Sequence, residues 1–368
     1  MTRLLIVDDS ALMRKLLGRI FSAEPEFEIQ FARNGIEALE LLKSFLPDVI
    51  TLDIHMPQMD GLSCLDRIMV ERPCAVVMLS SLTAEGADET MRAFELGAVD
   101  FVAKPTGAVT VRVDEFVPEL LEKVRSAAGA KFSSATRLKD RVRHNMARGT
   151  VSQRRAARKS VLPVEAAPGA EGLVLVGTST GGPPALEELL TRLPANFPWP
   201  IVIAQHMPPT FTGALARRLD QLCAIGVREV TEPKLLEPGC AYVGNGGGDV
   251  VVSRKAAGLM AAPAAPSPEY LWRPSVDRLV RSAMDCVAPA RLIGVQMTGM
   301  GNDGAEAMAL LHTRGGRVIA ESERTAIVWG MPGELVKLGG ADWILPLPDI
   351  ATKLNALAPT DAADTQDS

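Results

Sequence analysis

A serine in a glycine-rich segment is the first residue of this chain that could do chemistry. Ser179 lies in Gly177-Thr178-Ser179-Thr180-Gly181, which matches the G-x-S-x-G pattern of a strand-to-helix turn. The glycines permit a tight turn, and the backbone N–H groups left around the hydroxyl are what an oxyanion hole requires. We therefore predict a nucleophilic serine, with a turn that only binds an anion as the alternative.

A nucleophilic serine needs a base, and the chain contains only 4 histidines. His206 directly follows Gln205, at the carboxyl end of the apolar run 201–204. The others fall in less suitable places: His55 beside an acidic cluster, His144 in a basic stretch and His312 near the end of a predicted helix. His206 is the predicted base by elimination. The alternative is a histidine that is simply hydrogen-bonded in a loop.

The base in turn needs a carboxylate that fixes its tautomer. Asp303 follows the apolar run 292–295 in a loop dense in glycine, which permits close backbone approach. Asp249 and Asp277 are competitors, and Asp303 would also suit a helix N-cap. The order Ser179, His206, Asp303 differs from that of the α/β-hydrolases and of the large serine protease families, so we do not expect those folds.

A second group of polar residues follows the strands predicted in the first third of the chain. Its members are Asp8, Asp9, Asp53, Ser80 and Lys104. In an open parallel sheet such residues meet at the carboxyl edge. Clustered carboxylates need a cation, and Mg²⁺ prefers carboxylate oxygens. Asp53, alone at the end of the central strand, is the predicted nucleophile that forms an aspartyl phosphate. For any one of the acids, helix capping is the alternative.

Apolar runs that alternate with amphipathic segments indicate how these residues are held. Residues 1–129 contain predicted strands at 4–7, 27–31, 48–53, 75–80 and 99–102, and a last helix at 114–128. Strands that are apolar throughout indicate a parallel sheet covered on both faces. We predict a doubly wound α/β domain over 1–129. An X-Pro bond can be cis at low cost, and we considered Lys104-Pro105 a candidate.

A second α/β pattern spans residues 171–357, with predicted strands at 172–176, 201–204, 240–243, 292–295 and 317–320. We predict a second doubly wound parallel-sheet domain there. Residues 130–170 lose this periodicity and read as a flexible linker, and 358–368 as a polar tail. Residues 123–160 carry a local charge of +11 within a chain of net charge −5, so the linker is basic.

Composition excludes several classes of protein. Hydrophobic residues make up 47% of the chain but aromatics only 4%, so two aliphatic cores are expected. The sequence contains no run of about 18 apolar residues, so we expect no membrane span. The N-terminus lacks a signal peptide pattern. The 5 cysteines are scattered without metal-binding spacing, which favours reduced thiols in a cytoplasmic protein without zinc.

The first domain resembles the response-regulator receivers over about its first 125 residues, on the strength of Asp8-Asp9, Asp53, Ser80 and Lys104-Pro105. The resemblance implies that Asp53 accepts phosphate from a chemotaxis histidine kinase. It also implies Mg²⁺ ligands at Asp8, Asp9, Asp53 and the His55 carbonyl. Ser80 and Lys104 would then contact the phosphoryl oxygens, and Phe101 would be the switch aromatic rather than an ordinary core residue.

The second domain resembles the chemotaxis protein-glutamate methylesterases. The segments that carry the resemblance are 178–182, 205–208, Arg273-Pro274-Ser275-Val276-Asp277, Thr298-Gly299-Met300-Gly301-Asn302-Asp303-Gly304 and 330–332. The resemblance implies hydrolysis of glutamate γ-methyl esters on the cytoplasmic domains of chemoreceptors, and glutamine deamidation. It implies no cofactor for ester hydrolysis. The N–H groups of Thr180 and Met300 are the oxyanion-hole candidates, and the Thr180 hydroxyl a candidate to orient His206.

The sequence departs from the family at two places. Gly244-Asn245-Gly246-Gly247-Gly248-Asp249 stands where the family usually continues Ala-Pro-Gly, in a stretch expected to border the substrate cleft. Glu321-Ser322-Glu323 stands where the family usually has Gln-Asp-Glu.

Three other functions were weighed. A receiver with a non-catalytic output domain would not need Ser179, His206 and Asp303 together. Nucleic-acid binding by the arginine-rich linker is disfavoured because the linker lacks interleaved aromatics and no helix-turn-helix follows. Esterase activity in a signalling array other than chemotaxis stays open. We expect a monomer.

Overall fold

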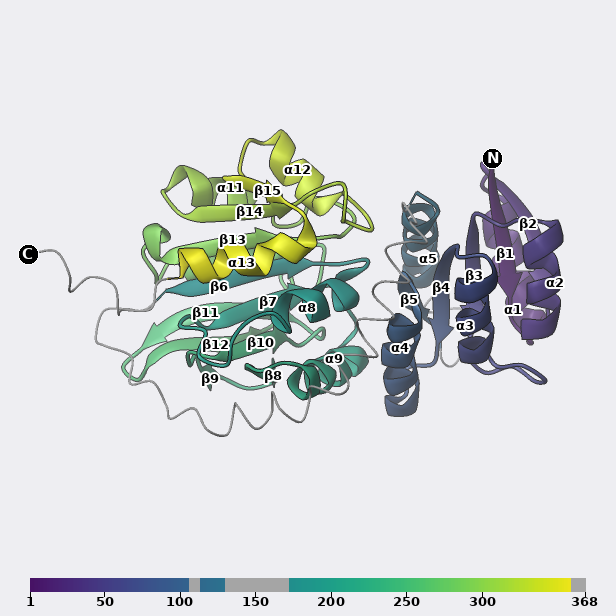
Figure 1. The fold of residues 1–368 in the computed structure, drawn as a ribbon, viewed down its shortest axis with the longest axis horizontal. Helices are drawn as coiled ribbons and strands as arrows, with labels where there is room; N and C mark the ends of the chain where they lie inside the picture. Colours follow the sequence, from purple (N-terminus) through teal and green to yellow (C-terminus); the bar gives the residue numbers. More distant parts are fainter. Residues whose placement is uncertain (106–112, 130–171, 359–368) are drawn as a thin grey trace, which may run out of the picture. The chain divides into compact units, whose positions relative to one another are not determined.

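The computed structural model describes residues 1–105, 113–129 and 172–358 (Figure 1). These residues form two separate compact units. The predicted linker over 130–170 lies outside the described residues, as does the predicted tail except for Ala358. In the ranges described, no helix is both long enough and apolar enough to cross a membrane.

The first unit contains a five-stranded parallel sheet of order β2-β1-β3-β4-β5, so the predicted doubly wound domain is confirmed. Its strands are β1 (Thr2–Val7), β2 (Phe27–Ala32), β3 (Val49–Asp53), β4 (Ala75–Ser80) and β5 (Asp100–Ala103). All residues of β3 and β4 are buried, as their continuous apolar sequences indicate for strands covered on both faces.

The helices of this unit begin close to the strand ends. They are α1 (Ala11–Ser22), α2 (Gly35–Ser44), α3 (Gly61–Glu71), α4 (Ala84–Leu96) and α5 (Val113–Ala128). The side chains of Ser10, Asn34, Asp60 and Thr83 cap the first four by accepting amide hydrogen bonds from the first turn. These caps fix where each helix starts and therefore the shape of the loops at the carboxyl edge of the sheet.

The second unit is built on a seven-stranded parallel sheet of order β15-β14-β13-β6-β7-β10-β8, which confirms the second predicted parallel-sheet domain. Its strands are β6 (Leu173–Thr178), β7 (Ile201–Gln205), β8 (Gly226–Val230), β10 (Cys240–Gly244), β13 (Leu292–Gln296), β14 (Arg317–Glu321) and β15 (Trp343–Leu345). The sequence predicted five of these strands and missed the two at the edges, β8 and β15.

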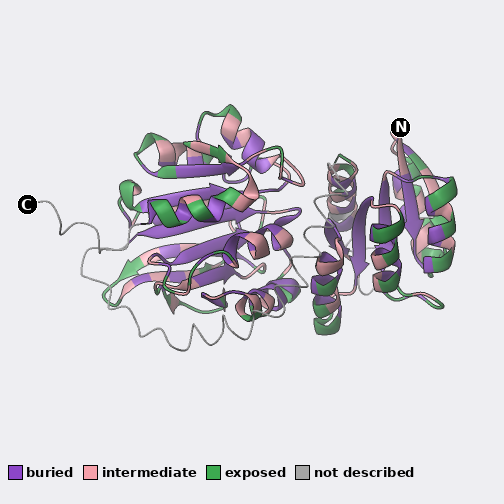
Figure 2. Cartoon of the chain, viewed as in Figure 1, coloured by how far each residue is buried: buried purple, intermediate pink, exposed green. Residues whose placement is uncertain are grey.

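Six helices cover this sheet in two rows. One row contains α10 (Val276–Met284), α11 (Ala305–Thr313) and α12 (Met331–Lys337); the other contains α13 (Leu347–Leu357), α8 (Gly182–Leu190) and α9 (Pro209–Leu222). A short 3-10 helix, Pro289–Arg291, precedes β13. The central strands β6, β7 and β13 are buried throughout, as the purple sheet in Figure 2 shows.

A small antiparallel sheet was not predicted. It consists of β9 (Lys234–Leu235), β11 (Asp249–Lys255) and β12 (Gly258–Ala264), and β11 packs against α10. The cis X–Pro bond in the part of the chain that the structure describes is Arg273–Pro274, so the idea of a cis Lys104–Pro105 bond was wrong.

The order of the strands gives each unit a topological switch point. In the first, the chain leaves β1 for β2 on one side, whereas β3, β4 and β5 follow on the other. In the second, β6 leads to β7 on one side, whereas β13, β14 and β15 extend on the other. Ligands of open parallel sheets bind at such switch points, beyond the carboxyl ends of the strands. Asp8 and Asp53 lie at the first switch point, and Ser179 at the second.

Candidate active site

Ser179 is held between two neighbouring strands at the switch point of the second unit. It follows β6 directly, and its N–H donates to the Thr298 carbonyl, beyond the end of β13, at 3.0 Å. On the other side, Gln205 Nε2 donates to the carbonyls of both Ser179 (3.0 Å) and His206 (2.9 Å). Because Thr178 pairs with Gln205 in the sheet, the next residues of the two strands, Ser179 and His206, come side by side.

The turn after Ser179 requires glycine at two positions. Gly181 has a φ of +76°, in the left-handed region that glycine adopts without strain. A Cβ on Gly182 would lie 1.8 Å from Gln205 Oε1, so any other residue would displace the side chain that holds Ser179 and His206 together. Gly181 therefore permits the tight turn that the G-x-S-x-G segment predicted, and Gly182, the residue after that segment, leaves room for the Gln205 side chain.

His206 and Asp303 are in direct contact. His206 Nε2 lies 2.8 Å from Asp303 Oδ2, and the histidine side chain is 10% exposed. The other ring nitrogen, Nδ1, is buried without a hydrogen-bond partner, so the Ser179 hydroxyl is not bonded to it in this structure. Hydrogen bonds of a catalytic serine often form only when substrate is bound. Trp272 stacks parallel to the imidazole, with ring centroids 6.0 Å apart.

The Asp303 carboxylate lies at the N-terminus of α10. Besides His206, it accepts hydrogen bonds from Ser275 Oγ (3.0 Å), Val276 N (2.7 Å) and Asp277 N (3.0 Å). Burial opposes its ionisation, but the hydrogen bonds from His206 and from the two amides outweigh burial and lower the pKa of Asp303. The helix N-terminus favours the same charge. Asp303 is therefore an anion that accepts a hydrogen bond from the protonated Nε2 of His206.

The two competitors of Asp303 have other partners. Asp249 accepts from Ser275 N at 2.8 Å and forms an ion pair with Arg278 at 2.5 Å. Asp277 accepts from Ala307 N at 2.9 Å, near the start of α11. Burial and the nearby charge of Asp303 raise the pKa of Asp277, although the Ala307 amide opposes this. Of the three aspartates, the structure brings Asp303 to His206.

The oxyanion-hole candidates Thr180 and Met300 lie on two segments that the structure joins at Thr298. Thr298 Oγ1 donates to the Thr180 carbonyl at 2.9 Å, and the Thr298 carbonyl accepts from Ser179 N. A Cβ on Gly299 would lie 2.8 Å from Ser179 Cβ, so the segment that leads to Met300 passes against the serine. Thr298 is fully buried, and the motif search did not single it out for this role.

The segment that departs from the family pattern does lie beside this site. A Cβ on Gly246 would lie 1.8 Å from the carbonyl oxygen of Met207, the residue after His206. Asp249, at the other end of the segment, begins β11 and holds the amide of Ser275. The segment therefore supports the loop of His206 and the start of α10.

In the first unit the acidic residues form one cluster. Carboxylate oxygens of Asp8, Asp9 and Asp53 lie within 4.8 Å of one another, close enough to share one metal ion. Lys104 Nζ lies 2.9 Å from Asp8 and 2.8 Å from Asp53. Burial raises the pKa of Asp53 and the Asp8 charge adds to this, against the opposing effect of Lys104. Three clustered carboxylates, one of them with a raised pKa, suit Mg²⁺.

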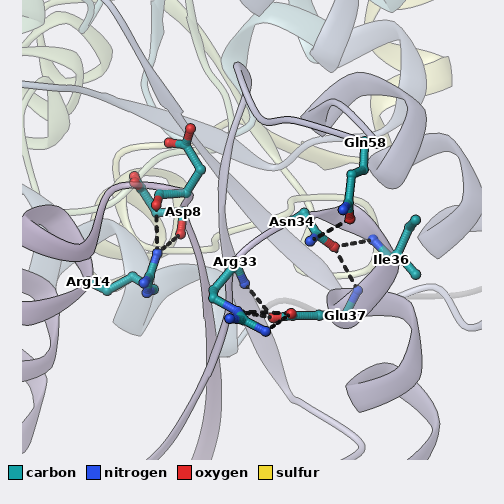
Figure 3. A network of polar contacts seen from close by, with 8 residues as sticks. Asp8, Arg14, Arg33, Asn34, Ile36, Glu37 and Gln58 are labelled. Carbon is teal, nitrogen blue, oxygen red and sulfur yellow. Dashed lines mark hydrogen bonds and ion pairs between the residues drawn. The ribbon is translucent and has the colours of Figure 1, made fainter.

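The loops around this cluster are fixed by polar contacts that Figure 3 shows. Arg14 Nη1 donates to the carbonyls of Asp8 (2.7 Å) and Asp9 (2.8 Å), and Asn34 Nδ2 donates to Gln58 Oε1 at 3.0 Å. Neither Arg14 nor Gln58 was singled out from the sequence. Arg14 contacts backbone carbonyls and Gln58 contacts a side-chain amide. The spacing of acidic residues in the sequence does not indicate such contacts.

The three other predicted residues of this unit contact α4 or α5 in this structure. Ser80 Oγ donates to the Gly86 carbonyl at 3.1 Å and accepts from Thr90 at 2.9 Å. The His55 side chain pairs with Glu89 at 3.1 Å. The metal ligand predicted at this residue is its backbone carbonyl, not this side chain. Phe101 is buried, packs edge-on to Phe94 with centroids 6.1 Å apart, and lies under the ammonium of Lys123.

Comparisons with known proteins cover both units. Residues 4–113 match the response regulator receiver domain model, and residues 174–354 match the CheB methylesterase model. A protein-glutamate methylesterase/protein-glutamine glutaminase of Rhodopseudomonas palustris is 53% identical over 99% of this chain and 100% of its own length. One of Rhodospirillum rubrum is 52% identical over 97% and 96%. The solved CheB methylesterase catalytic domain of Thermotoga maritima covers 51% of this chain and 98% of its own, with 36% identity and a TM-score of 0.49.

The relatives match this chain from end to end, and both family models fall on the units that hold the two sites. The chain therefore belongs to the protein-glutamate methylesterase/protein-glutamine glutaminase family, whose CheB methylesterase domain follows a response-regulator receiver domain.

Proposed function

We propose that this protein hydrolyses glutamate γ-methyl esters on chemoreceptor cytoplasmic domains, deamidates glutamines there, and is activated by phosphorylation of Asp53. The observation that carries the hydrolase assignment is the buried His206–Asp303 pair beside Ser179, at the switch point of the methylesterase domain. Activity in the cytoplasm and phosphate supplied by a chemotaxis histidine kinase belong to the same proposal.

The contacts around His206 support a triad mechanism with a defined tautomer. Because ionised Asp303 can only accept, Nε2 carries the proton and Nδ1 carries the lone pair. Nδ1 then takes the proton of the Ser179 hydroxyl as the oxygen attacks the ester carbonyl. The imidazolium formed is stabilised by Asp303. The same nitrogen delivers the proton to the methoxy oxygen as its bond to the carbonyl carbon breaks, which releases methanol, or to the amide nitrogen of a glutamine, which releases ammonia.

The second half of the reaction repeats these roles. A water molecule gives a proton to Nδ1 and its oxygen attacks the acyl carbon. The bond between that carbon and Ser179 Oγ then breaks, and Nδ1 returns the proton to Oγ, which releases the glutamate side chain and restores Ser179. In both halves a negative oxygen forms, and the amides of Thr180 and Met300 are the proposed donors to it. Trp272 stacks parallel to the imidazole of His206 and so lies beside the proposed base.

The receiver site is proposed to work through its acidic cluster. Asp8, Asp9, Asp53 and the His55 carbonyl would hold Mg²⁺, which when bound neutralises the carboxylates and the phosphoryl oxygens. Asp53 attacks the phosphoryl group and Lys104 pairs with it afterwards. For Ser80 to contact that group, its hydroxyl must leave Gly86, which would connect phosphorylation to α4 and, through packing on Phe94, to Phe101.

Substitution of the nucleophile tests the hydrolase assignment. S179A should abolish methanol release from a methyl-esterified receptor fragment, since loss of the serine costs about 10⁶ in kcat in a serine protease. Phosphorylation of Asp53 by an acyl phosphate should be unchanged in S179A and serves as the control for folding. Methanol release above a few per cent of the unsubstituted rate would refute the assignment of Ser179.

A further inference from the structure

A fully buried glutamate lies behind the active site and has no place in the mechanism above. Glu321 is the last residue of β14 and is 0% exposed. Its Oε2 accepts the N–H of Thr298 at 2.9 Å, whereas Oε1 is buried without a hydrogen-bond partner. Burial raises the pKa of Glu321 to about 7, although the Thr298 amide and the Thr325 hydroxyl act in the opposite direction. Near neutral pH both protonation states are therefore populated.

Thr298 connects this carboxyl group to the nucleophile. Its N–H is held by Glu321, its hydroxyl donates to the Thr180 carbonyl, and its carbonyl accepts from Ser179 N. Its hydroxyl oxygen also accepts from Val328 N at 3.0 Å. Glu321 thus fixes Thr298, which contacts both Ser179 and Thr180 and lies two residues before Met300.

No charged side chain in the described part of the chain forms an ion pair with Glu321. Its strand neighbours β13 and β15 contain no charged residues. On the helices and loops packed against β14 the charged groups pair elsewhere or face solvent: Glu306 with Arg281, His312 with Asp342, Glu334 with Lys337, Lys353 over Trp343, Arg317 with the Leu357 carbonyl, and exposed Glu323, Arg324 and Asp349. Titration of Glu321 therefore changes an uncompensated charge.

We propose, on the basis of the ester hydrolysis proposed above, that Glu321 is a positioning residue whose protonated form supports catalysis and whose ionised form slows it. The hydrogen bond to Thr298 persists in both forms, because a carboxyl group keeps an acceptor oxygen. Ionisation adds a negative charge one hydrogen bond behind the segment that must stabilise a second negative charge on the substrate oxygen. Like charges in a dry interior repel strongly, so the barrier rises.

The test is the pH dependence of kcat for methanol release by the full chain, without phosphodonor, from pH 5.5 to 9. The unsubstituted protein should show a falling limb at alkaline pH, along which kcat drops by about tenfold as Glu321 ionises. E321Q keeps an oxygen acceptor for Thr298 but cannot ionise. The kcat of E321Q should lack this falling limb and lie about tenfold above that of the unsubstituted protein at pH 8.5.

A second variant separates charge from position. E321L removes the acceptor and leaves the Thr298 amide unsatisfied, so kcat should fall about tenfold or more at every pH while KM changes little. The inference is wrong if E321Q and the unsubstituted protein give parallel profiles, if the unsubstituted protein has no falling limb, or if E321L retains full kcat. Absence of methanol release from the unsubstituted protein at every pH, also after addition of an acyl phosphate and Mg²⁺, would instead refute the proposed function itself.

Discussion

His206 uses its two ring nitrogens for different tasks. Nε2 faces Asp303 at 2.8 Å, and Nδ1 faces a buried space in which it has no partner. An unpartnered buried acceptor costs free energy, and active sites retain such atoms where a substrate proton must be received. The four hydrogen bonds that converge on Asp303 keep that side chain from turning toward Nδ1 or accepting the proton itself.

Glu321 gives a stability prediction at the same scale. Its pKa is raised from the model-peptide value of 4.5 to about 7, so the folded state binds a proton that the unfolded state has already lost. The contribution of Glu321 to stability is therefore largest below pH 4.5, where both states are protonated, and is lost as pH rises toward 7, by on the order of 3 kcal/mol. E321Q should raise Tm at pH 8.5 and have a much smaller effect at pH 5.

Thermal unfolding followed by circular dichroism at the two pH values measures this difference. E306Q is the matched control, because the Glu306 side chain is 70% exposed and its neutralisation should leave the pH dependence unchanged. An equal Tm change for E321Q at both pH values would show that Glu321 does not ionise in the folded protein.

Sequence reasoning found the reacting residues but not those that hold them. Ser179, His206 and Asp303 could be predicted because nucleophile, base and acid belong to few residue types and must lie at strand ends. Thr298, Glu321 and Trp272 act through a backbone carbonyl, a buried carboxyl group and a ring face. These contacts depend on how β13 and β14 pair and where the loop before α10 passes, and sequence spacing carries no information on either.

At the scale of elements, strands buried on both faces were the easiest to predict, although the partly exposed edge strand β2 was predicted as well. The central strands β1, β3, β4, β6, β7 and β13 are continuous apolar runs and were all found. In β8, Arg228 and Glu229 interrupt the apolar pattern because the strand is an edge of the sheet. The hairpin β11–β12 buries alternate residues against α10, a weaker pattern in a stretch rich in glycine and alanine.

The N-terminus of α10 is the element on which the triad depends most. Ser275 Oγ donates to Asp303 and accepts from Arg278 N, so one hydroxyl caps the helix and orients the carboxylate. S275A should lower stability by about 1 kcal/mol, as loss of an N-cap does, and should also reduce kcat several-fold with little change in KM.

Thr83 is the N-cap of α4 in the other unit and provides the matched control. T83A should cost a similar amount of stability, measured by urea unfolding of the unit concerned, without loss of basal methanol release. If S275A lowered stability but left kcat unchanged, the hydroxyl would be a cap alone and Asp303 would be held by the backbone amides.

At the scale of the whole molecule, one architecture is used twice for two kinds of group transfer, of a phosphoryl group and of an acyl group. Both units place a nucleophile at the switch point of a parallel sheet: Asp53 at the end of β3 and Ser179 beyond β6. In the first, clustered carboxylates and Lys104 suit a phosphoryl group; in the second, an imidazole and backbone amides suit an ester. A chain with both sites can turn a phosphorylation signal into a change in the methylation of a receptor.

The most direct test of this account is methanol release by the full chain with and without an acyl phosphate in the presence of Mg²⁺. The account predicts that the acyl phosphate raises the rate in the unsubstituted protein. D53N should keep the basal rate but fail to respond, since an amide cannot accept the phosphoryl group. Omission of Mg²⁺ should have the same effect as D53N. An equal response of D53N and the unsubstituted protein, or no response of either, would contradict the claim that Asp53 controls the hydrolysis at Ser179.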